Sequence, residues 1–382
     1  MTEKLYWNDC YQTQFDAKVL EINNQGIFLD KTLFYPEGGN QVSDRGVIKK
    51  ENYHFEVKYV SKEDNLILHH LSGKFKECIN KGDIIEGIID WEYRYGVMRA
   101  HSSQHLLSAI FKNSLNIDTT RANISFEDVS LHISKSVNMG ELENVLQEFM
   151  KTSTIENLVL TSKIISQKEA ENLNEEIRGD LSSEDNLRVI EIQNCDVNCC
   201  GGTHVKNTSE IGPCYFYEIK KGSEFKYLVG NKAIEMLSKH NLGILDVATS
   251  LNRPIENILP IIKDQIIRLK EENLNFINKM LEVISINPTI TKRIKLGVLD
   301  FDIDYKILSK KFKEFPPDYV LVIKRDSKSI LILSNSEEYK ANEAIDLLIK
   351  KYGGKGGGSP KSAQVILTSE PKDLIFDIET NL

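Results

Sequence analysis

The chain has 382 residues, 41% of them hydrophobic and 27% charged, and a formal net charge of −8. This length allows two or three domains with hydrophobic cores, and an acidic chain has no general affinity for nucleic acid, so any RNA contact must come from local patches. No apolar run is long enough to span a bilayer, and Met1–Lys4 does not begin a signal peptide, which predicts a cytoplasmic protein. The six cysteines are interpreted as ligands and core thiols rather than as a disulfide framework.

Residues 1–90 predict a small β-barrel. Short runs of alternating apolar and polar residues are separated by Gly, Asn and Asp, which are turn signals. The clearest runs are Ala17–Ile22, His54–Val60 and Ile84–Ile89. We interpret the His69–His70 pair, which lies in another strand-like run, as structural.

The segment Phe34–Gly46 interrupts this pattern. Its neighbouring glycines, Gly38 and Gly39, permit backbone angles and a close ligand approach that other residues forbid. From its residues alone, a long hairpin loop is the favoured interpretation.

Residues 91–240 predict an α+β domain with helices packed on a mostly antiparallel sheet. A helix that begins after Asp90 carries His101 and His105, and an apolar run follows them. The further predicted elements are a hairpin over Asn123–Ile133, an amphipathic helix over Leu142–Phe149, a strand over Leu158–Ile165, a polar helix over Lys168–Ile177, a strand over Leu187–Ile192 and a closing hairpin over Phe216–Val229.

Two short motifs within this region offer metal ligands. His101 and His105 are four residues apart on the predicted helix, so both imidazoles share one face. Two glycines between Cys200 and His204 allow the backbone to turn tightly and aim both side chains at one point. Three imidazoles and one thiolate favour zinc over magnesium or calcium, so we predict one zinc ion per chain. Each motif alone is also explained by a helix surface or a tight turn, and Cys199 competes with Cys200.

Residues 241–288 predict a helical linker. From Pro254 to Ser285, apolar residues recur in alternating steps of four and three, which is the spacing of a coiled-coil seam. Asn273 on this seam is the kind of polar residue that fixes register in a paired coil. A paired coil predicts a homodimer, for which the C-terminal domain is the other candidate contact. A single helix lying along one domain explains the pattern nearly as well.

Residues 289–382 predict a separate α/β unit. Its expected strands and helix are Ile294–Leu299, Tyr319–Ile323, Ser329–Leu333 and Ala341–Lys351. Five glycines around Lys355 and Lys361 then predict a backbone loop whose amide and ammonium groups hold phosphates. A flexible linker is the alternative, and the strand-like run Val365–Leu367 directly after it makes a linker the weaker interpretation.

Several segments, in this order, resemble the long-form stand-alone alanyl-tRNA editing proteins (the AlaX family) and the matching C-terminal parts of alanyl-tRNA synthetase. They are the Phe34-Tyr-Pro-Glu-Gly-Gly loop, the Asp90-Trp-Glu segment that begins the next helix, the His-x3-His helix and Cys200-Gly-Gly-Thr-His-Val. In addition, the glycine-rich tail resembles the DHH-associated domain. The resemblance covers essentially the whole chain. It implies ATP-independent hydrolysis of tRNA(Ala) mischarged with serine or glycine, with zinc ligands at His101, His105, Cys200 and His204.

Further site residues follow from the same segments. Gln104 and Thr203, beside the ligands, are the candidate catalytic groups. The candidate substrate- and tRNA-binding residues are Glu37, Gly38, Gly39, Gln41, Arg121, Lys355, Gly356, Gly357, Gly358 and Lys361. The family usually has a third glycine and then Gln-Pro where this chain has Asn40-Gln41-Val42. It often has Thr-x-Ser-Phe-His where this chain has Thr119–Asn123, which leaves the preferred amino acid open.

Two functional classes remain. A catalytic zinc normally keeps one open position, whereas four protein ligands close a structural site. The alternative to a hydrolase is therefore a non-catalytic tRNA-binding module with a structural zinc. A phosphoesterase is less supported, because the sequence has no Asp-His-His motif and no aspartate cluster for two metals.

Overall fold

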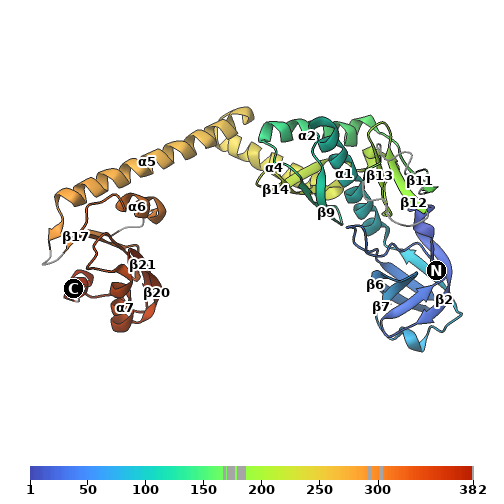
Figure 1. Cartoon of the computed structure of the whole chain (residues 1–382), viewed down its shortest axis with the longest axis horizontal. Helices are drawn as coiled ribbons and strands as arrows, with labels where there is room; N and C mark the ends of the chain where they lie inside the picture. The colour runs from blue at the N-terminus through green and yellow to red at the C-terminus, as the bar shows by residue number, and fades with distance from the viewer. Residues whose placement is uncertain (167–168, 170–176, 179–185, 291–293, 301–303, 381–382) are drawn as a thin grey trace. The chain divides into compact units, whose positions relative to one another are not determined.

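The computed structural model describes residues 1–166, 169, 177–178, 186–290, 294–300 and 304–380. They form two compact units, Met1–Asp246 and Val247–Leu382 (Figure 1). The finer division at residues 90, 240 and 288 stays a prediction. Among the described residues, no helix combines the length and the apolar composition needed to cross a membrane.

A closed six-stranded barrel, in the order β2-β3-β7-β6-β5-β8, forms the first part of unit 1 and confirms the predicted barrel. Its strands are β2 (Gln14–Ile22), β3 (Gly26–Leu29), β5 (Gly46–Lys50), β6 (Tyr53–Glu63), β7 (Leu66–Leu71) and β8 (Ile84–Ile89), and the short β1 (Glu3–Lys4) pairs with β4 (Lys31–Thr32) outside it. The alternation in β2 buries Phe15, Ala17 and Val19 in the barrel core. His69 is buried on β7, where its ring nitrogens contact Thr32 Oγ1 at 2.8 Å and the Ile27 carbonyl oxygen at 3.2 Å.

Helix α1 (Trp91–Leu115) is the central helix of unit 1 (Figure 1). Asp90 caps its N-terminus by accepting a hydrogen bond from the Tyr93 amide, and Asn116, with φ +53°, ends it. The helix contacts a four-stranded sheet in the order β14-β15-β10-β9. These strands are β9 (Thr119–Ser125), β10 (Asp128–Ile133), β14 (Cys214–Lys220) and β15 (Glu224–Val229), all paired antiparallel as predicted.

Two further elements complete this α+β part. Helix α2 (Met139–Lys151) buries Leu142, Val145 and Phe149 in the same core. A three-stranded antiparallel sheet contains β11 (Leu160–Ser166), β12 (Asn186–Ile192) and β13 (Asp196–Cys199). The predicted helix over residues 168–177 lies outside the described residues, apart from Glu169 and Ile177.

The barrel is joined to α1 by a buried ion pair and to β9 by its glycine loop. The Arg94 guanidinium and the Asp44 carboxylate are both almost fully buried and form two hydrogen bonds, one of them 2.7 Å long. Arg94 also donates to the carbonyl of Cys10 at 3.0 Å. The amide of Ile124 donates to the Asn40 carbonyl at 2.8 Å, so the loop is held against the sheet.

Helix α4 (Gly230–Leu251) follows β15 without a linker, so helical structure begins before residue 241, where the helical linker was predicted to start. Glu127, buried in the turn after β9, accepts the amide hydrogens of Asn231 and Lys232 and so caps α4. The predicted long helix is α5 (Ile258–Ile286), with Pro260 in its first turn. Most of its proposed seam is exposed, including Leu259 and Leu269, so a paired coil stays a prediction.

Unit 2 is built on a mixed sheet in the order β16-β17-β18-β19-β21-β20. Its elements are β16 (Thr289–Ile290), β17 (Lys295–Leu299), α6 (Tyr305–Phe312), β18 (Tyr319–Lys324), β19 (Ser329–Ser334), α7 (Ala341–Tyr352), β20 (Gly354–Ser359), β21 (Ser362–Leu367) and α8 (Leu374–Thr380). Only β17 and β18 are parallel among its described pairs. One sheet face packs on α7 and α8, and the other packs on α6 and the end of α5.

The glycine-rich tail is a strand, and the predicted phosphate-binding loop is wrong as a backbone structure. Its glycines form the edge strand β20, paired along its length with β21. Gly354 has φ +130°, and a Cβ atom there would overlap the Ile366 carbonyl. A glycine is therefore required to bring the two strands together.

Candidate metal centre

Helix α1 places His101 and His105 on one buried face, one turn apart, with their ring centroids 5.0 Å apart. The loop after β13 places His204 opposite them, 4.3 Å from the His101 ring and 4.7 Å from the His105 ring. Cys200 Sγ lies 3.5 Å from His101 Nε2 and 3.3 Å from His204 Nε2. One ligand atom from each residue falls within 4.8 Å of every other, so the structure brings together all four predicted ligands.

Gly202 allows the ligand loop to approach α1 this closely. A Cβ atom at Gly202 would lie 2.6 Å from Gln41 Oε1 and closer still to the His101 ring. Cys199, the alternative ligand, lies in β13 opposite Val189 and is not in the cluster. Cys200 is therefore the thiol that faces the imidazoles.

Burial controls the protonation of these groups. It lowers the pKa of His101 to about 3, and it lowers the pKa values of His105 and His204 well below the usual value. All three imidazoles are therefore neutral at pH 7, which is the form that binds metal. Burial raises the pKa of Cys200 to about 11, so a bound cation would have to displace the thiol proton.

Two side chains orient the imidazoles. Gln41, from the barrel loop, accepts a hydrogen bond from His101 Nδ1 at 2.7 Å, which leaves Nε2 directed at Cys200. Ser102 Oγ lies 3.2 Å from His204 Nδ1 and accepts the amide hydrogen of Val205. The Gln41 contact selects the tautomer in which Nε2 of His101 carries a free lone pair, and the Ser102 contact helps to hold the His204 ring in place.

Arg188 holds the ligand loop from the side of β12. Its Nη1 donates to the carbonyl oxygens of Cys200 at 3.0 Å and Gly202 at 2.7 Å. Its charge favours the thiolate of Cys200 and opposes protonation of the imidazoles. Both effects favour metal binding.

The residues fit a metal ion by an independent criterion. His105 Nδ1 is buried and has no hydrogen-bond partner among the described residues. A buried nitrogen without a hydrogen-bond partner is destabilising. A cation bound among the four ligand atoms would give their lone pairs a partner. The donor set of three nitrogens and one sulfur suits zinc.

The other predicted residues are distributed more widely. Thr203 accepts from Gln41 Nε2 at 3.0 Å and donates its amide to Gln41 Oε1, so its side chain braces Gln41. Gln104 donates to Ser108 at 2.8 Å along α1. Arg121 is exposed on β9, opposite His132. The tail residues lie in unit 2, so they are not part of the cluster.

The barrel loop also lines a cavity of about 530 Å³ beside the cluster. Glu37, Gly38 and Gln41, three of the residues predicted to bind substrate, line it from the loop, and polar residues of the β9–β10 hairpin line it as well. Those are Asn123, Ser125, Asp128 and Ser130. Gln41 therefore contributes to the cavity and also contacts the His101 ring.

Sequence reasoning missed the roles of Ser102 and Arg188. Ser102 directly follows His101, but a helical serine gives no signal of the residue it contacts. Arg188 carries a weak signal, because a charged residue in the apolar run 187–190 needs a buried partner.

Comparison with known proteins shows the family to which the chain belongs. Residues 7–93 match the family of class II (A) tRNA synthetases, and residues 187–224 match the second additional domain of threonyl- and alanyl-tRNA synthetases. The chain is 33% identical to an alanyl-tRNA editing protein, AlaX-M, of Methanosarcina barkeri, over 55% of this chain and 90% of that protein. The chain belongs to the alanyl-tRNA editing proteins.

Other relatives of this alanyl-tRNA editing protein extend the likeness to the full chain. The AlaX-L editing protein of Pyrococcus horikoshii is 28% identical and covers 99% of this chain and 97% of its own length. The alanine–tRNA ligase of Methanobrevibacter smithii is 29% identical over 95% of this chain, which spans 44% of the ligase. A solved DHH domain of a ribosomal-protein S1p family member is similar over 33% of the chain, with a TM-score of 0.22 and 15% identity.

Proposed function

We propose that this chain is a trans-editing hydrolase that removes serine, and secondarily glycine, from mischarged tRNA(Ala) without ATP. The observation that carries this proposal is the buried cluster of three neutral imidazoles and one thiol, in a chain of the alanyl-tRNA editing family. The bond that breaks is the ester between the amino acid and the terminal ribose. Water supplies the hydroxyl of the released carboxylate, and the ribose oxygen takes the proton.

The protein groups have separate tasks in this proposal. One zinc ion, when bound by His101, His105, Cys200 and His204, supplies Lewis-acid chemistry for the ester carbonyl. Gln41 holds the ring of His101 in its ligand tautomer and, through Thr203, fixes the loop. Thr203 and Gln104 stay our candidates for groups beside the reacting ester.

The cavity beside Gln41 is the proposed site for the 3′ end of the tRNA. Its lining is polar, so it can hydrogen-bond a ribose and a serine hydroxyl. Gln41 lines the cavity and also contacts the His101 ring, so a ribose bound in the cavity would lie next to the metal centre. Gly38 in this wall allows the ligand to approach the backbone.

The activity test uses metal-loaded full-length chain and labelled seryl-, glycyl- and alanyl-tRNA(Ala). We expect serine release to exceed alanine release by about 10-fold or more, because a polar pocket recognises a hydroxyl that alanine lacks. Cys200→Ala serves as the inactive control. Equal rates on seryl- and alanyl-tRNA(Ala) would refute selective editing.

The zinc assignment has its own test. Purified chain should contain about one zinc per molecule, and Cys200→Ala or His105→Ala should lower that content by removing a ligand. Cys199→Ala is the matched control, because Cys199 is the neighbouring thiol outside the cluster. Elemental analysis that finds no zinc in protein prepared without chelator would contradict the site.

The number of protein ligands supports a second candidate function, a structural role for the zinc. Four protein ligands suit a closed structural zinc, so the alternative is a tRNA-binding module without catalysis. Release of no amino acid from any aminoacyl-tRNA by zinc-loaded chain that binds tRNA would select this alternative.

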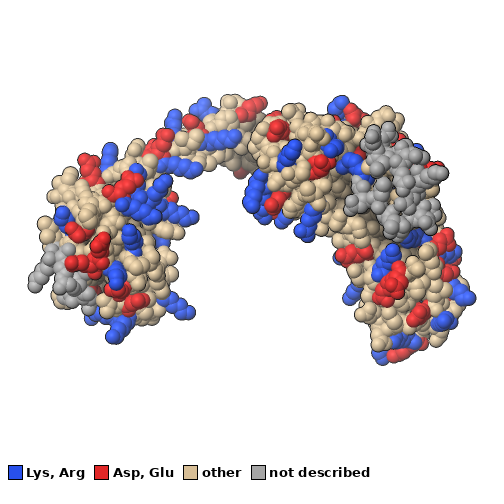
Figure 2. Space-filling view, viewed as in Figure 1, with Lys and Arg blue, Asp and Glu red and all other residues tan. Residues whose placement is uncertain are grey.

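The proposed partner is mischarged tRNA(Ala), with unit 2 as a second contact. Lys355, Gly356, Gly357, Gly358 and Lys361 are exposed on the β20–β21 hairpin and are proposed to contact phosphates. On the face seen in Figure 2, basic and acidic side chains are intermixed. A homodimer through the exposed α5 seam and a cytoplasmic location remain part of the proposal.

A further inference from the structure

A segment near the N-terminus, Trp7–Tyr11, contacts the loop that carries the thiol and the third imidazole of the cluster. Trp7 Nε1 donates a hydrogen bond to the Gly201 carbonyl oxygen at 2.9 Å, across 194 positions of sequence. Cys10 Sγ donates to the His204 carbonyl oxygen at 3.2 Å, across the same 194 positions. Because the offset is the same at both contacts, the segment runs alongside the ligand loop.

Tyr11 extends these contacts past the last ligand. Its hydroxyl accepts the Lys206 amide hydrogen at 2.8 Å and donates to Glu210 Oε2 at 2.7 Å. Glu210 Oε1 in turn accepts the amide hydrogens of Lys206 and Asn207, each at 3.1 Å. One hydroxyl and one carboxylate therefore hold the backbone directly after His204.

Tyr11 is itself held by helix α1, which carries the other two imidazoles. Its ring packs on Trp91, with the centroids 5.4 Å apart, and on Tyr95, with the centroids 6.4 Å apart. The Lys206 ammonium lies 4.3 Å from the centroid of the Tyr11 ring on the loop side. Because its ring contacts the helix and its hydroxyl contacts the loop, this side chain links the two segments that bear ligands.

The backbone groups around the last ligand each have a partner, so the loop does not depend on one contact. The Val205 amide donates to Ser102 Oγ at 3.1 Å, and the Lys206 carbonyl accepts from the Leu160 amide at 2.8 Å. Loss of one contact among several satisfied groups is expected to shift this backbone rather than to unfold it. A shift of the backbone moves the His204 ring relative to the helix.

We propose that Tyr11 is a positioning residue of the metal centre, which acts on His204 through the backbone amide of Lys206. A metal ion binds tightly when its ligand atoms are held at the right distances, and the contacts that orient ligands contribute to this affinity. Tyr11 precedes the first barrel strand, β2, so the N-terminal part of unit 1 contributes to metal affinity as well as to the proposed substrate cavity. The inference rests on the metal centre of the proposed function.

The test compares Tyr11→Phe with Tyr95→Phe in the full-length chain. Both hydroxyls donate to Glu210 Oε2, at 2.7 and 2.8 Å, and the Tyr11 hydroxyl in addition accepts the Lys206 amide hydrogen. Because both variants lose a bond to Glu210, tryptophan fluorescence of the metal-free proteins should show similar decreases in the unfolding midpoint. The dissociation constant for Co²⁺, measured against a competing chelator, should rise about 10-fold in Tyr11→Phe and stay unchanged in Tyr95→Phe.

The absorption of bound Co²⁺ adds a measurement that a purely structural hydroxyl would not change. It depends on the geometry and identity of the ligands. The spectrum of cobalt-saturated Tyr11→Phe should therefore differ from that of the wild-type chain, and cobalt-saturated Tyr95→Phe should match the wild-type chain. A purely structural role of Tyr11 would lower the unfolding midpoint and leave the affinity and the spectrum unchanged.

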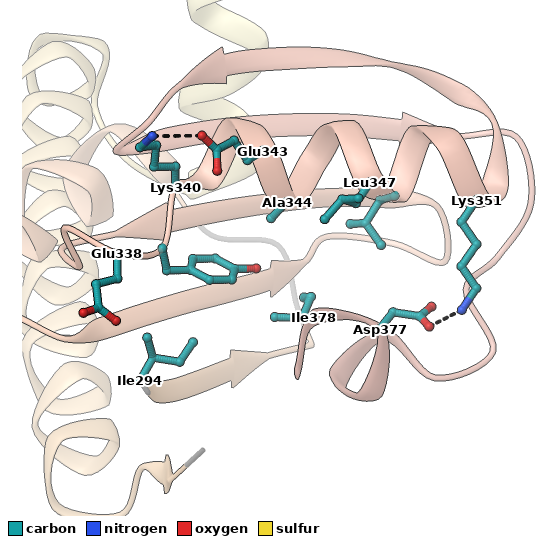
Figure 3. Close-up of a pocket in the computed structure, with 11 residues that line it drawn as sticks. Ile294, Glu338, Lys340, Glu343, Ala344, Leu347, Lys351, Asp377 and Ile378 are labelled. Atoms are coloured by element: carbon teal, nitrogen blue, oxygen red, sulfur yellow. Dashed lines mark hydrogen bonds and ion pairs between the residues drawn. The ribbon is translucent and has the colours of Figure 1, made fainter. Parts of the chain in front are cut away.

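Tyr352→Phe is a second control, which lies in unit 2. The Tyr352 hydroxyl donates to Asp377, and Asp377 also pairs with Lys351 at the cavity of about 250 Å³ between α7 and α8 (Figure 3). This variant removes the same kind of bond from the other unit, so it should change neither the cobalt affinity nor the spectrum.

Two results would overturn the proposal, and they are distinguishable. Equal cobalt affinities and equal spectra for Tyr11→Phe and Tyr95→Phe would show that Tyr11 does not position the ligand, with the metal centre itself intact. A wild-type chain that binds neither Co²⁺ nor Zn²⁺ would contradict the metal centre of the proposed function, and this inference with it.

Discussion

Gly202→Ala is expected to lose most of the bound zinc and most of the deacylation activity, whereas Gly201→Ala keeps both. At position 202 the new methyl group would overlap the His101 ring and lie 2.6 Å from Gln41 Oε1, so the ring or the ligand loop has to move. At position 201 the nearest atom is 3.9 Å away, in Trp7. Displacing a ligand and its orienting partner typically lowers metal affinity by about 10-fold or more.

The measurement is zinc content after dialysis against a weak chelator, together with release of serine from seryl-tRNA(Ala). Gly201→Ala and Gly202→Ala place the same methyl group at neighbouring positions of one loop, so the two variants have the same amino-acid composition. Full zinc content and full activity in Gly202→Ala would show that the loop does not depend on this close approach.

Asp44→Ala is expected to lower the free energy of unfolding of unit 1 by about 3–5 kcal/mol, because it leaves the buried guanidinium of Arg94 without its carboxylate. Both side chains are almost fully inaccessible to water, and Asp44 also accepts the amide hydrogen of Tyr35. Glu191→Ala is the control, since it breaks the exposed pair with Lys163 and should cost about 0–1 kcal/mol.

Tryptophan fluorescence during denaturation measures this effect in the full chain. The two tryptophans, Trp7 and Trp91, both lie in unit 1, so the signal reports that unit alone. Equal midpoints and slopes for Asp44→Ala and Glu191→Ala would contradict the assignment of Asp44 and Arg94 as the main link between barrel and helix.

The elements that sequence reasoning predicted well carry a local signal. The barrel strands alternate with period two, and the closing hairpin turns at Gly222, which has φ +68°. The His101–His105 spacing is a property of any helix, and Asp90 marks where that helix begins. Local periodicity therefore predicted the elements and the faces of the helix that bear ligands.

The parts that were missed depend on tertiary contacts. Gln41 lies 60 residues before His101, and no local pattern distinguishes a side chain that orients an imidazole from one that touches substrate. The start of helix α4, before residue 241, was missed because its cap comes from Glu127, more than a hundred positions earlier. The glycines of β20 predicted a loop because clustered glycines favour turns and loops, whereas here they allow close pairing with β21.

The assembly of the cluster from distant segments has a consequence for synthesis on the ribosome. His101 and Cys200 are 99 positions apart, and Gln41 is made earlier still. At roughly 5–20 residues per second, the helix bearing two imidazoles emerges about 5–20 s before the thiol that completes the set. During that interval the nascent chain offers only two imidazoles, so tight capture of the proposed zinc ion would have to wait for the last ligand loop. Loading of the proposed metal would then mark the moment at which barrel, helix and loop have all docked.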